Sequence, residues 1–174
     1  MQQLPKLSNS LRIIKKSTCS KISPQARGQL TYHIGYDETA KTFHLRVTEN
    51  TGGGFFSNEW IGIDSILETV AALPTNEPFK AVIFIPLYQS TSANNHGFLA
   101  AALRAENLLG IVDGQPLSHT LGDIKVFKAA MAKLFKEKVD LHDDVAEAEA
   151  IREKKCEEMV ERMKAVGKGK TIKK

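Results

Sequence analysis

The sequence has little cysteine, no recognisable catalytic motif and no long apolar run, and each absence excludes a class of protein. Its two cysteines, Cys19 and Cys156, lie far apart, without the close spacing of a disulfide framework or a zinc site. Two reduced thiols are typical of a cytosolic protein. The longest apolar stretch, residues 81–87, contains Pro86 and is far too short to cross a bilayer. No secretion signal precedes it, so we expect a cytoplasmic protein with no membrane partner.

Motifs for metal binding, nucleotide binding and nucleophilic catalysis are also missing. The triple glycine Gly52-Gly53-Gly54 leads into Phe55 and an expected strand, whereas a dinucleotide or phosphate loop must open a helix. The five histidines lack metal-ligand spacing, and neither cysteine has an activating neighbour sequence. We therefore expect no catalytic residue, no metal and no cofactor, although an enzyme with an unfamiliar site stays a third alternative.

Charge is distributed unevenly along a chain whose net charge is +4. Residues 1–30 carry six Lys or Arg and no acid, and residues 162–174 also carry six bases and no acid. Residues 140–161, in contrast, carry three bases against nine acids. Basic chain ends attract anionic polymers such as nucleic acid, although they are common on inert proteins as well.

Residues 29–73 predict a β-meander followed by a helix. Apolar residues alternate with polar ones over 30–36 and again over 43–47, and the polar link 37–41 between them is typical of a hairpin. A third strand is expected from Phe55 or Phe56 to Ile63. Asp64 is the expected cap of a helix, with Ser65 and Glu68 as a capping pair.

The second half of the chain predicts one buried strand and three helices. The continuous apolar run from Lys80 to Leu87 is consistent with a strand buried on both faces. A helix is expected over 97–109, with Gly110 as its stop, and Asp113-Gly114 is typical of a turn. Asp123 is the expected cap of the next helix, and a last helix is expected to start near Asp143.

These patterns predict an α+β protein, in which an antiparallel β-meander is packed by helices and followed by a charged helical C-terminal region. We expect a basic, partly irregular N-terminal arm over residues 1–28, with a short strand or helix near residues 11–16. The α+β domain then covers 29–122, the C-terminal helices cover 123–166, and a disordered basic tail covers 167–174.

The polar face of the hairpin is the main candidate site. Its side chains alternate with the apolar ones, so we expect His33, His44 and Arg46 to face water. Single-stranded nucleic acid needs flat side chains for base stacking and cations for phosphates, and aromatic residues follow nearby. The alternative is that at least one of these aromatics is a core residue. The candidate nucleic-acid-binding residues are Lys15, Lys16, Arg27, Lys41, His44, Arg46, Phe55, Trp60, Lys168 and Lys170.

The stretch TFHLRVTENTGGGFFSNEWIGIDSILETVAAL, within residues 30–73, resembles the Whirly and transcriptional-coactivator single-stranded-DNA-binding fold. The resemblance rests on a strand, a glycine-bearing loop, a strand ending in alternating isoleucines and an acid-capped helix. It implies binding of single strands on a sheet surface by a dimer with packed helices. The leading hypothesis is thus a non-enzymatic nucleic-acid-binding accessory protein that forms a homodimer.

Two alternatives stay open. The sequence Asn94-Asn95-His96-Gly97 precedes a helix whose free N–H groups can hold a phosphate, although helix capping explains the asparagines equally well. The C-terminal helix carries Cys156, Met159, Met163 and Val166 at an a/d spacing. That seam favours a protein–protein interaction adaptor as the rival function.

Overall fold

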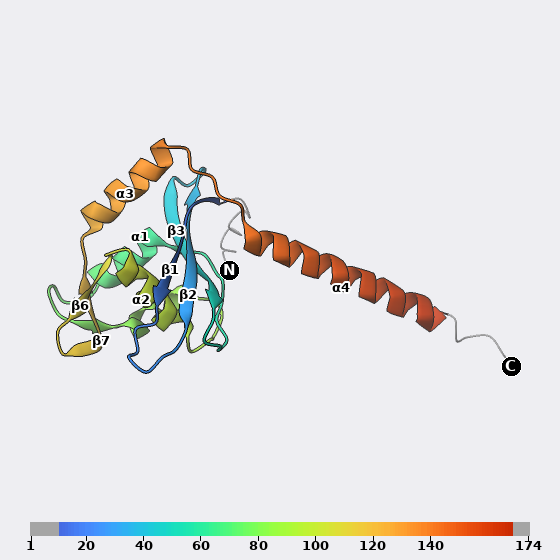
Figure 1. The fold of residues 1–174 in the computed structure, drawn as a ribbon, viewed down its shortest axis with the longest axis horizontal. Helices are drawn as coiled ribbons and strands as arrows, with labels where there is room; N and C mark the ends of the chain where they lie inside the picture. The colour runs from blue at the N-terminus through green and yellow to red at the C-terminus, as the bar shows by residue number, and fades with distance from the viewer. Residues whose placement is uncertain (1–10, 169–174) are drawn as a thin grey trace. The chain divides into compact units, whose positions relative to one another are not determined.

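Residues 11–168 are described by the computed structural model, and the chain divides after Leu141 into two units, Met1–Leu141 and His142–Lys174. The first unit contains two antiparallel sheets and four helices, and the described part of the second unit is one helix, α4 (Asp144–Lys168) (Figure 1). The fold is therefore α+β, as the sequence predicts. No helix within residues 11–168 has the length and apolar character needed to cross a membrane.

The larger sheet is an antiparallel meander in the order β1-β2-β3-β4. Its strands are β1 (Arg12–Ser20), β2 (Gln29–Asp37), β3 (Thr42–Asn50) and β4 (Ile61–Gly62). The hairpin register pairs Tyr32 with Val47 and Ile34 with Leu45, so the alternating apolar side chains of both strands share one face. The predicted hairpin is confirmed.

Helices cover that apolar face. Helix α2 (Asn95–Ala105) packs against β1, β2 and β3, and α1 (Ile63–Ala71) packs against β3. Leu99 and Leu103 of α2 are fully buried against the sheet residues Ile34 and Leu45 within one hydrophobic cluster. Burying one such side chain contributes about 1.5–3 kcal/mol, so this layer is the main source of stability.

A smaller sheet in the order β5-β7-β6 completes the first unit. Its strands are β5 (Phe79–Lys80), β6 (Leu109–Val112) and β7 (Gln115–Leu121), and the predicted turn Asp113-Gly114 joins the last two. Helix α3 (Ile124–Lys136) begins where predicted, because the Asp123 carboxylate accepts hydrogen bonds from the N–H groups of Lys125 and Val126.

The N-terminal segment differs from its prediction. Residues 12–20 form a nine-residue strand, β1, which pairs with β2 along its length instead of lying partly irregular on the surface. Ile13 and Ile14 are both almost fully buried. The sequence of this segment is rich in polar residues and has no clear strand pattern. It forms a strand because β2, which is distant in the chain, supplies its backbone hydrogen bonds.

The predicted buried strand at residues 80–87 is wrong. Residues Ala81–Leu87 form a 3-10 helix, η1, of which Phe84 is fully buried while Val82 and Ile85 are 54% and 53% exposed. Pro86 lacks the N–H that a central strand needs, so a ladder through this position would lose a hydrogen bond.

Two helix boundaries also differ. Helix α1 begins at Ile63 after Gly62 with no side-chain cap bond, so the predicted Asp64 cap and capping pair are wrong, and Asp64 lies in the first turn. Helix α2 ends at Ala105 and not at Gly110, which belongs to β6. Asn107 takes the left-handed conformation (φ 58°) after the helix, a role that asparagine fills when glycine is absent.

A buried carboxylate joins the sheet to the end of α2. Glu106, which is 7% exposed, accepts a 2.5 Å hydrogen bond from the hydroxyl of Tyr32 on β2. Its carboxylate also lies 2.7 Å from the ammonium of Lys15 on β1. Burial, and next this hydrogen bond, raises the pKa of Tyr32, and burial with the nearby Glu106 charge raises the pKa of Cys19 to about 11.

We predict that Glu106→Ala lowers the free energy of unfolding by about 2–3 kcal/mol, because it leaves a buried hydroxyl and an ammonium without their acceptor. Urea denaturation measures the change. The control is Glu38→Ala, which removes an exposed partner of Arg12 and should cost less than about 1 kcal/mol. Equal losses in the two variants would contradict a stabilising role for the Glu106 cluster.

Candidate functional site

The polar face of the hairpin is buried, which corrects the prediction that it faces water. His33, His44 and Arg46 are 2%, 9% and 5% exposed. Burial lowers the pKa of His44, which favours its neutral form near neutral pH. A single strand of nucleic acid therefore finds no open stacking surface at these three residues.

Trp60 covers part of this face. The guanidinium carbon of Arg46 lies 4.3 Å from the centre of the Trp60 ring, a cation–π contact. Beneath the ring, Gly35 of β2 leaves room for it, since a Cβ there would lie 2.9 Å from the ring carbon Cη2. Trp60 is half-buried and packs against the sheet. Of the nearby aromatic residues, Phe56 is the one that packs against the hydrophobic core, as the alternative interpretation expects.

The other predicted site residues lie apart from one another. Lys15 contacts Glu106, and Lys41 lies 3.8 Å from the carboxylate of Glu38. Lys16 is half-buried on β1, whereas Arg27 is exposed in the loop between β1 and β2. The side chain of Lys168 and the whole of Lys170 lie outside the described residues. None of the described candidates lines the cleft reported below, although Phe55 directly follows Gly54, which does.

Phe55 is 92% exposed on a loop whose backbone is held firmly. Its carbonyl oxygen accepts hydrogen bonds from the Ser92 hydroxyl (2.6 Å) and the Asn94 side-chain amide (2.8 Å). Two residues further along the chain, the N–H of Ser57 donates a hydrogen bond to the side-chain oxygen of Asn95 (2.8 Å), and Asn95 is buried. The two asparagines therefore hold this loop, and Asn94 makes no side-chain cap bond to α2.

Hydrogen bonds to Glu59 connect the same loop to the segment before α2. Its carboxylate accepts hydrogen bonds from the N–H groups of Gln89 (2.8 Å) and Ser90 (3.0 Å). Burial alone would raise the pKa of Glu59, but these bonds and one from Ser57 outweigh it, so its pKa lies below the ordinary value. Because these bonds replace strand pairing, only residues 61–62 of the predicted third strand form β4.

A cleft of about 500 Å³ opens beside this loop. Gly53 and Gly54, the first turn of α2, and the start of η1 all contribute to its wall. Lys21 and Lys80 bring positive charge, and no Asp or Glu among the described residues lines it. The complete lining is Lys21, Ile22, Ser23, Ala26, Gly53, Gly54, Lys80, Ala81, Val82, Ala93, Asn94, His96, Gly97, Phe98, Leu117 and His119.

The cations of the cleft are positioned by neighbours without negative charge. The Lys21 ammonium lies 5.2 Å from the centre of the Phe98 ring, and the Lys80 ammonium donates a 2.8 Å hydrogen bond to the Ser118 hydroxyl. The N-terminal end of α2 adds the positive end of the helix dipole to the same wall. Apolar walls with these cations fit an anionic ligand that also carries an apolar or aromatic part.

His119 at the cleft wall is held neutral. Burial, followed by the charges of Arg104 and Lys80, lowers its pKa from 6.5 to about 4. The Arg104 Nε–H donates to its Nδ1 at 3.0 Å, so the ring proton is on Nε2. His119 can therefore donate a hydrogen bond without adding charge.

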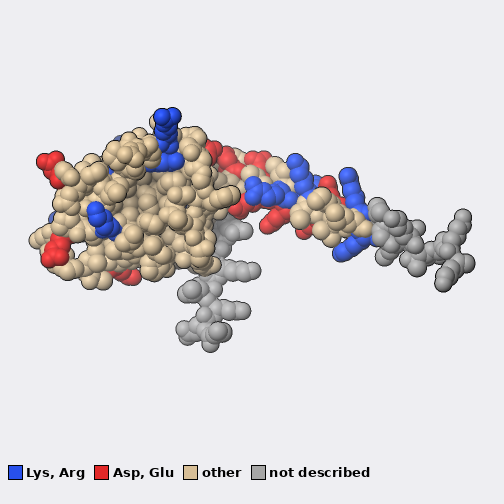
Figure 2. All heavy atoms as spheres, turned by 90° about the horizontal axis from the view of Figure 1, so that it is seen from below, with Lys and Arg blue, Asp and Glu red and all other residues tan. Residues whose placement is uncertain are grey.

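Lysines also lie on the first unit outside the cleft, among them Lys125, Lys128 and Lys136 on α3. On the face drawn in Figure 2, Lys and Arg are scattered and do not form a continuous basic band. Sequence reasoning noted the start of α2 and counted Lys21 only among the basic residues of the N-terminal end, and it missed Lys80 and His119 as site residues. No local pattern joins these three, because they come together only when the β1–β2 loop, β5 and β7 fold against α2.

Comparison with protein-family models, curated proteins and solved structures finds no match for this chain.

Two substitutions should distinguish an aromatic side chain that packs in the fold from one that is exposed to solvent. We predict that Trp60→Ala lowers the free energy of unfolding by about 3 kcal/mol, since it removes the ring over Gly35 and uncovers Arg46. Phe55→Ala should change it by less than about 0.5 kcal/mol, because the Phe55 side chain is solvated. Chemical denaturation of both variants measures this, and equal stability of the Trp60 variant and the parent would contradict the packing.

The depressed pKa of His119 predicts a pH dependence of stability. Its pKa is 6.5 when unfolded and about 4 when folded, so below pH 6.5 the unfolded chain binds the proton more readily. The contribution of His119 is therefore complete above pH 6.5 and is lost as the pH falls toward 4. His119→Gln should show a shallower loss of stability over that window than the parent, in urea titrations at stepped pH.

The matched control is His142→Gln, because the His142 side chain is 66% exposed. It should keep the slope of the parent protein. If His119→Gln also keeps that slope, His119 is not the group that couples stability to pH.

Proposed function

We propose that this protein is a non-enzymatic nucleic-acid-binding accessory protein that binds single-stranded DNA or RNA at the cleft and the loop beside it. The proposal rests on one observation. The exposed aromatic residue Phe55 directly follows Gly54, which lines a cleft that contains two lysines and no carboxylate of the described chain.

The geometry supplies the two contacts that a single strand needs. Phe55 offers a face for base stacking, which is tolerant of sequence because every base has a π face. Lys21, Lys80 and the start of α2 offer positive charge for a neighbouring phosphate. The cleft volume of about 500 Å³ suits one nucleotide turned out of the strand.

This location replaces the sheet surface that the Whirly-like resemblance implies. In the proposal, Arg46, His44 and Trp60 support the fold. The ligand is held at the edge of the sheet by the residues that line the cleft, among them Lys21 and Lys80. Contacts from the basic chain ends, including Lys168 and Lys170, stay predictions that add unspecific attraction to phosphates.

Fluorescence anisotropy with labelled single-stranded and double-stranded oligonucleotides tests the proposal. Phe55→Ala should raise the Kd for single strands by roughly 5- to 150-fold, because stacking of one base contributes about 1–3 kcal/mol. Lys21→Glu and Lys80→Glu should each weaken binding of all sequences and reduce the salt dependence by about 0.7 slope units per lost contact.

Matched controls lie outside the cleft. Ile111→Ala removes another exposed apolar side chain (72% exposed), and Lys128→Glu reverses an exposed charge on α3. Both should leave the Kd within about twofold of the parent, as stability and binding rarely change at unconnected surface sites. A parent protein without salt-sensitive affinity for any oligonucleotide would overturn the proposal. Competition by a mononucleotide at equal affinity would identify a free nucleotide as the ligand instead.

The rival function is a protein–protein interaction adaptor that uses α4. The observation in its favour is the exposure of large apolar side chains on this helix, among them Met159 (57%) and Met163 (67%). Deleting residues 142–174 separates the two functions, since the adaptor needs this segment and the cleft does not.

A further inference from the structure

The second unit cannot bury its own apolar side chains. Its described part is a single helix, α4, so no other element of the unit packs against Ile151, Met159, Val160 or Met163, which are 44–67% exposed. A helix this rich in charge is marginal in water and takes most of its stability from packing of an apolar face. The helix therefore needs a partner surface.

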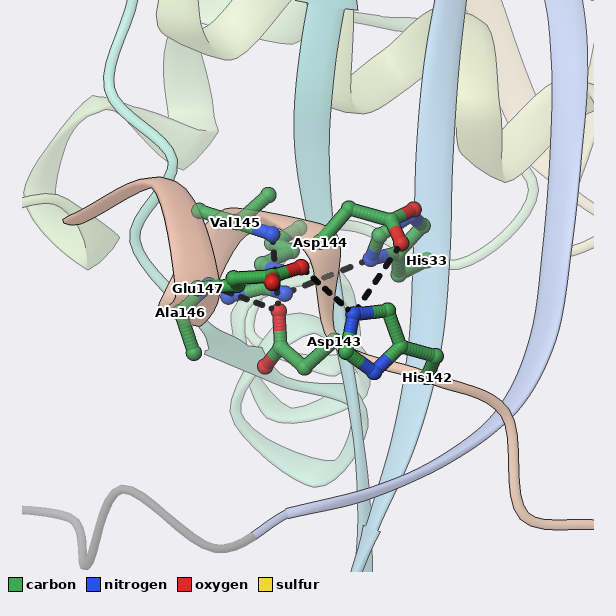
Figure 3. Close-up of polar contacts among 8 residues, drawn as sticks. His33, His142, Asp143, Asp144, Val145, Ala146 and Glu147 are labelled. Atoms are coloured by element: carbon green, nitrogen blue, oxygen red, sulfur yellow. Dashed lines mark hydrogen bonds and ion pairs between the residues drawn. The ribbon is translucent and has the colours of Figure 1, made fainter. Parts of the chain in front are cut away.

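The start of α4 is well defined by its own side chains. The Asp143 carboxylate accepts hydrogen bonds from the N–H groups of Val145 (3.1 Å) and Ala146 (3.0 Å), and His142 Nε2 lies 2.8 Å from the Glu147 carboxylate (Figure 3). Asp144 in the first turn complements the helix dipole. These contacts set where the helix begins.

One side of the helix carries a narrow apolar stripe. At 100° per residue, Val145, Ala148, Cys156, Met159 and Met163 fall on the same side of α4. Arg152 also lies in the stripe, where its aliphatic stem can cover apolar surface while the guanidinium reaches water. The stripe is too narrow for a globular core and has the width of a two-helix seam.

The charges along α4 decide the direction of pairing. From Asp143 to Glu149 the chain has four acids and no base, whereas from Arg162 to Lys168 it has three bases and no acid. A parallel pair of identical helices would place acid beside acid and base beside base. An antiparallel pair places the acidic start of one helix beside the basic end of the other, and opposite charges stabilise such a seam.

We propose that α4 is an antiparallel self-association helix whose partner is α4 of a second copy of this chain. A pair centred between residues 155 and 156 brings Ala148 level with Met163 of the second copy and Ile151 level with its Val160. The same register brings Glu149 level with Arg162 and Glu147 level with Lys164. Toward the ends of the helix, apolar residues thus meet apolar residues and acids meet bases. Nearer the centre, Arg152 lies level with Met159 and Glu153 level with Glu158, so the pairing is stabilised mainly by the terminal contacts. This pairing is independent of nucleic-acid binding at the cleft.

Disulfide trapping in the full-length protein tests both the partner and the direction. In a Cys156→Ser background, one preparation carries Ala148→Cys and a second, of different mass, carries Met163→Cys. After the two are mixed and mildly oxidised, the antiparallel pair predicts that the mixed disulfide is the main product. Predominant homodimers of Ala148→Cys would show a parallel pair and overturn the proposal.

Sedimentation velocity of the parent protein supplies the second measurement. The double variant Met159→Glu/Met163→Glu should weaken self-association at least tenfold, because it places charge in the seam. Its control is Glu157→Gln, which lies on the opposite side of α4 and should leave the association unchanged. A parent protein that stays monomeric at all concentrations would overturn the proposal.

Discussion

The carboxylate of Glu106 is the polar contact on which the first unit depends. It holds Lys15 on β1, Tyr32 on β2 and the end of α2 in one arrangement, with a 2.5 Å hydrogen bond to the Tyr32 hydroxyl. Hydrophobic burial between α2 and the sheet is larger in energy, but it has no direction. A nearly buried carboxylate needs its partners, so it selects the one alignment of α2 on the strands that satisfies them. The N-terminal strand is thereby tied into the core, and the loop after it can form one side of the cleft.

On the second face of the sheet, polar side chains contribute to the packing of the fold and are not exposed for binding. Arg46 and His33 occupy positions that usually face water, yet Trp60 packs on the Arg46 guanidinium and over the space left by Gly35. Because this face is covered, the candidate binding surface lies at the edge of the sheet. There the Glu59 carboxylate and the Asn94 and Asn95 amides hold the glycine loop without strand pairing. Phe55 is left exposed to solvent, directly after Gly54 in the cleft that Lys21 and Lys80 also line.

The two units differ in how their apolar side chains are covered. The first has a core in which α1, α2 and α3 bury apolar side chains against sheets, whereas the described part of the second is a single helix with an apolar stripe and no core of its own. A ligand site in one unit and a self-association helix in the other would let two copies of the cleft act on one strand. Two linked sites bind a polymer more tightly than either alone, provided that the strand can span them.

The sequence by itself determined the elements whose causes are local. The alternation over residues 30–47 predicts β2 and β3, and Asp123 and Asp143 predict the starts of α3 and α4, because a side chain and the N–H groups it caps are neighbours in the chain. Only the tertiary structure decided what covers each face. Alternation shows that two faces differ, but not that Trp60 covers part of the polar one. Pro86, in contrast, is a local signal against a central strand, and the strand prediction for residues 80–87 gave it too little weight. The cleft joins segments near residues 21, 54, 80, 96 and 119, and no local pattern holds the long-range contacts that bring them together.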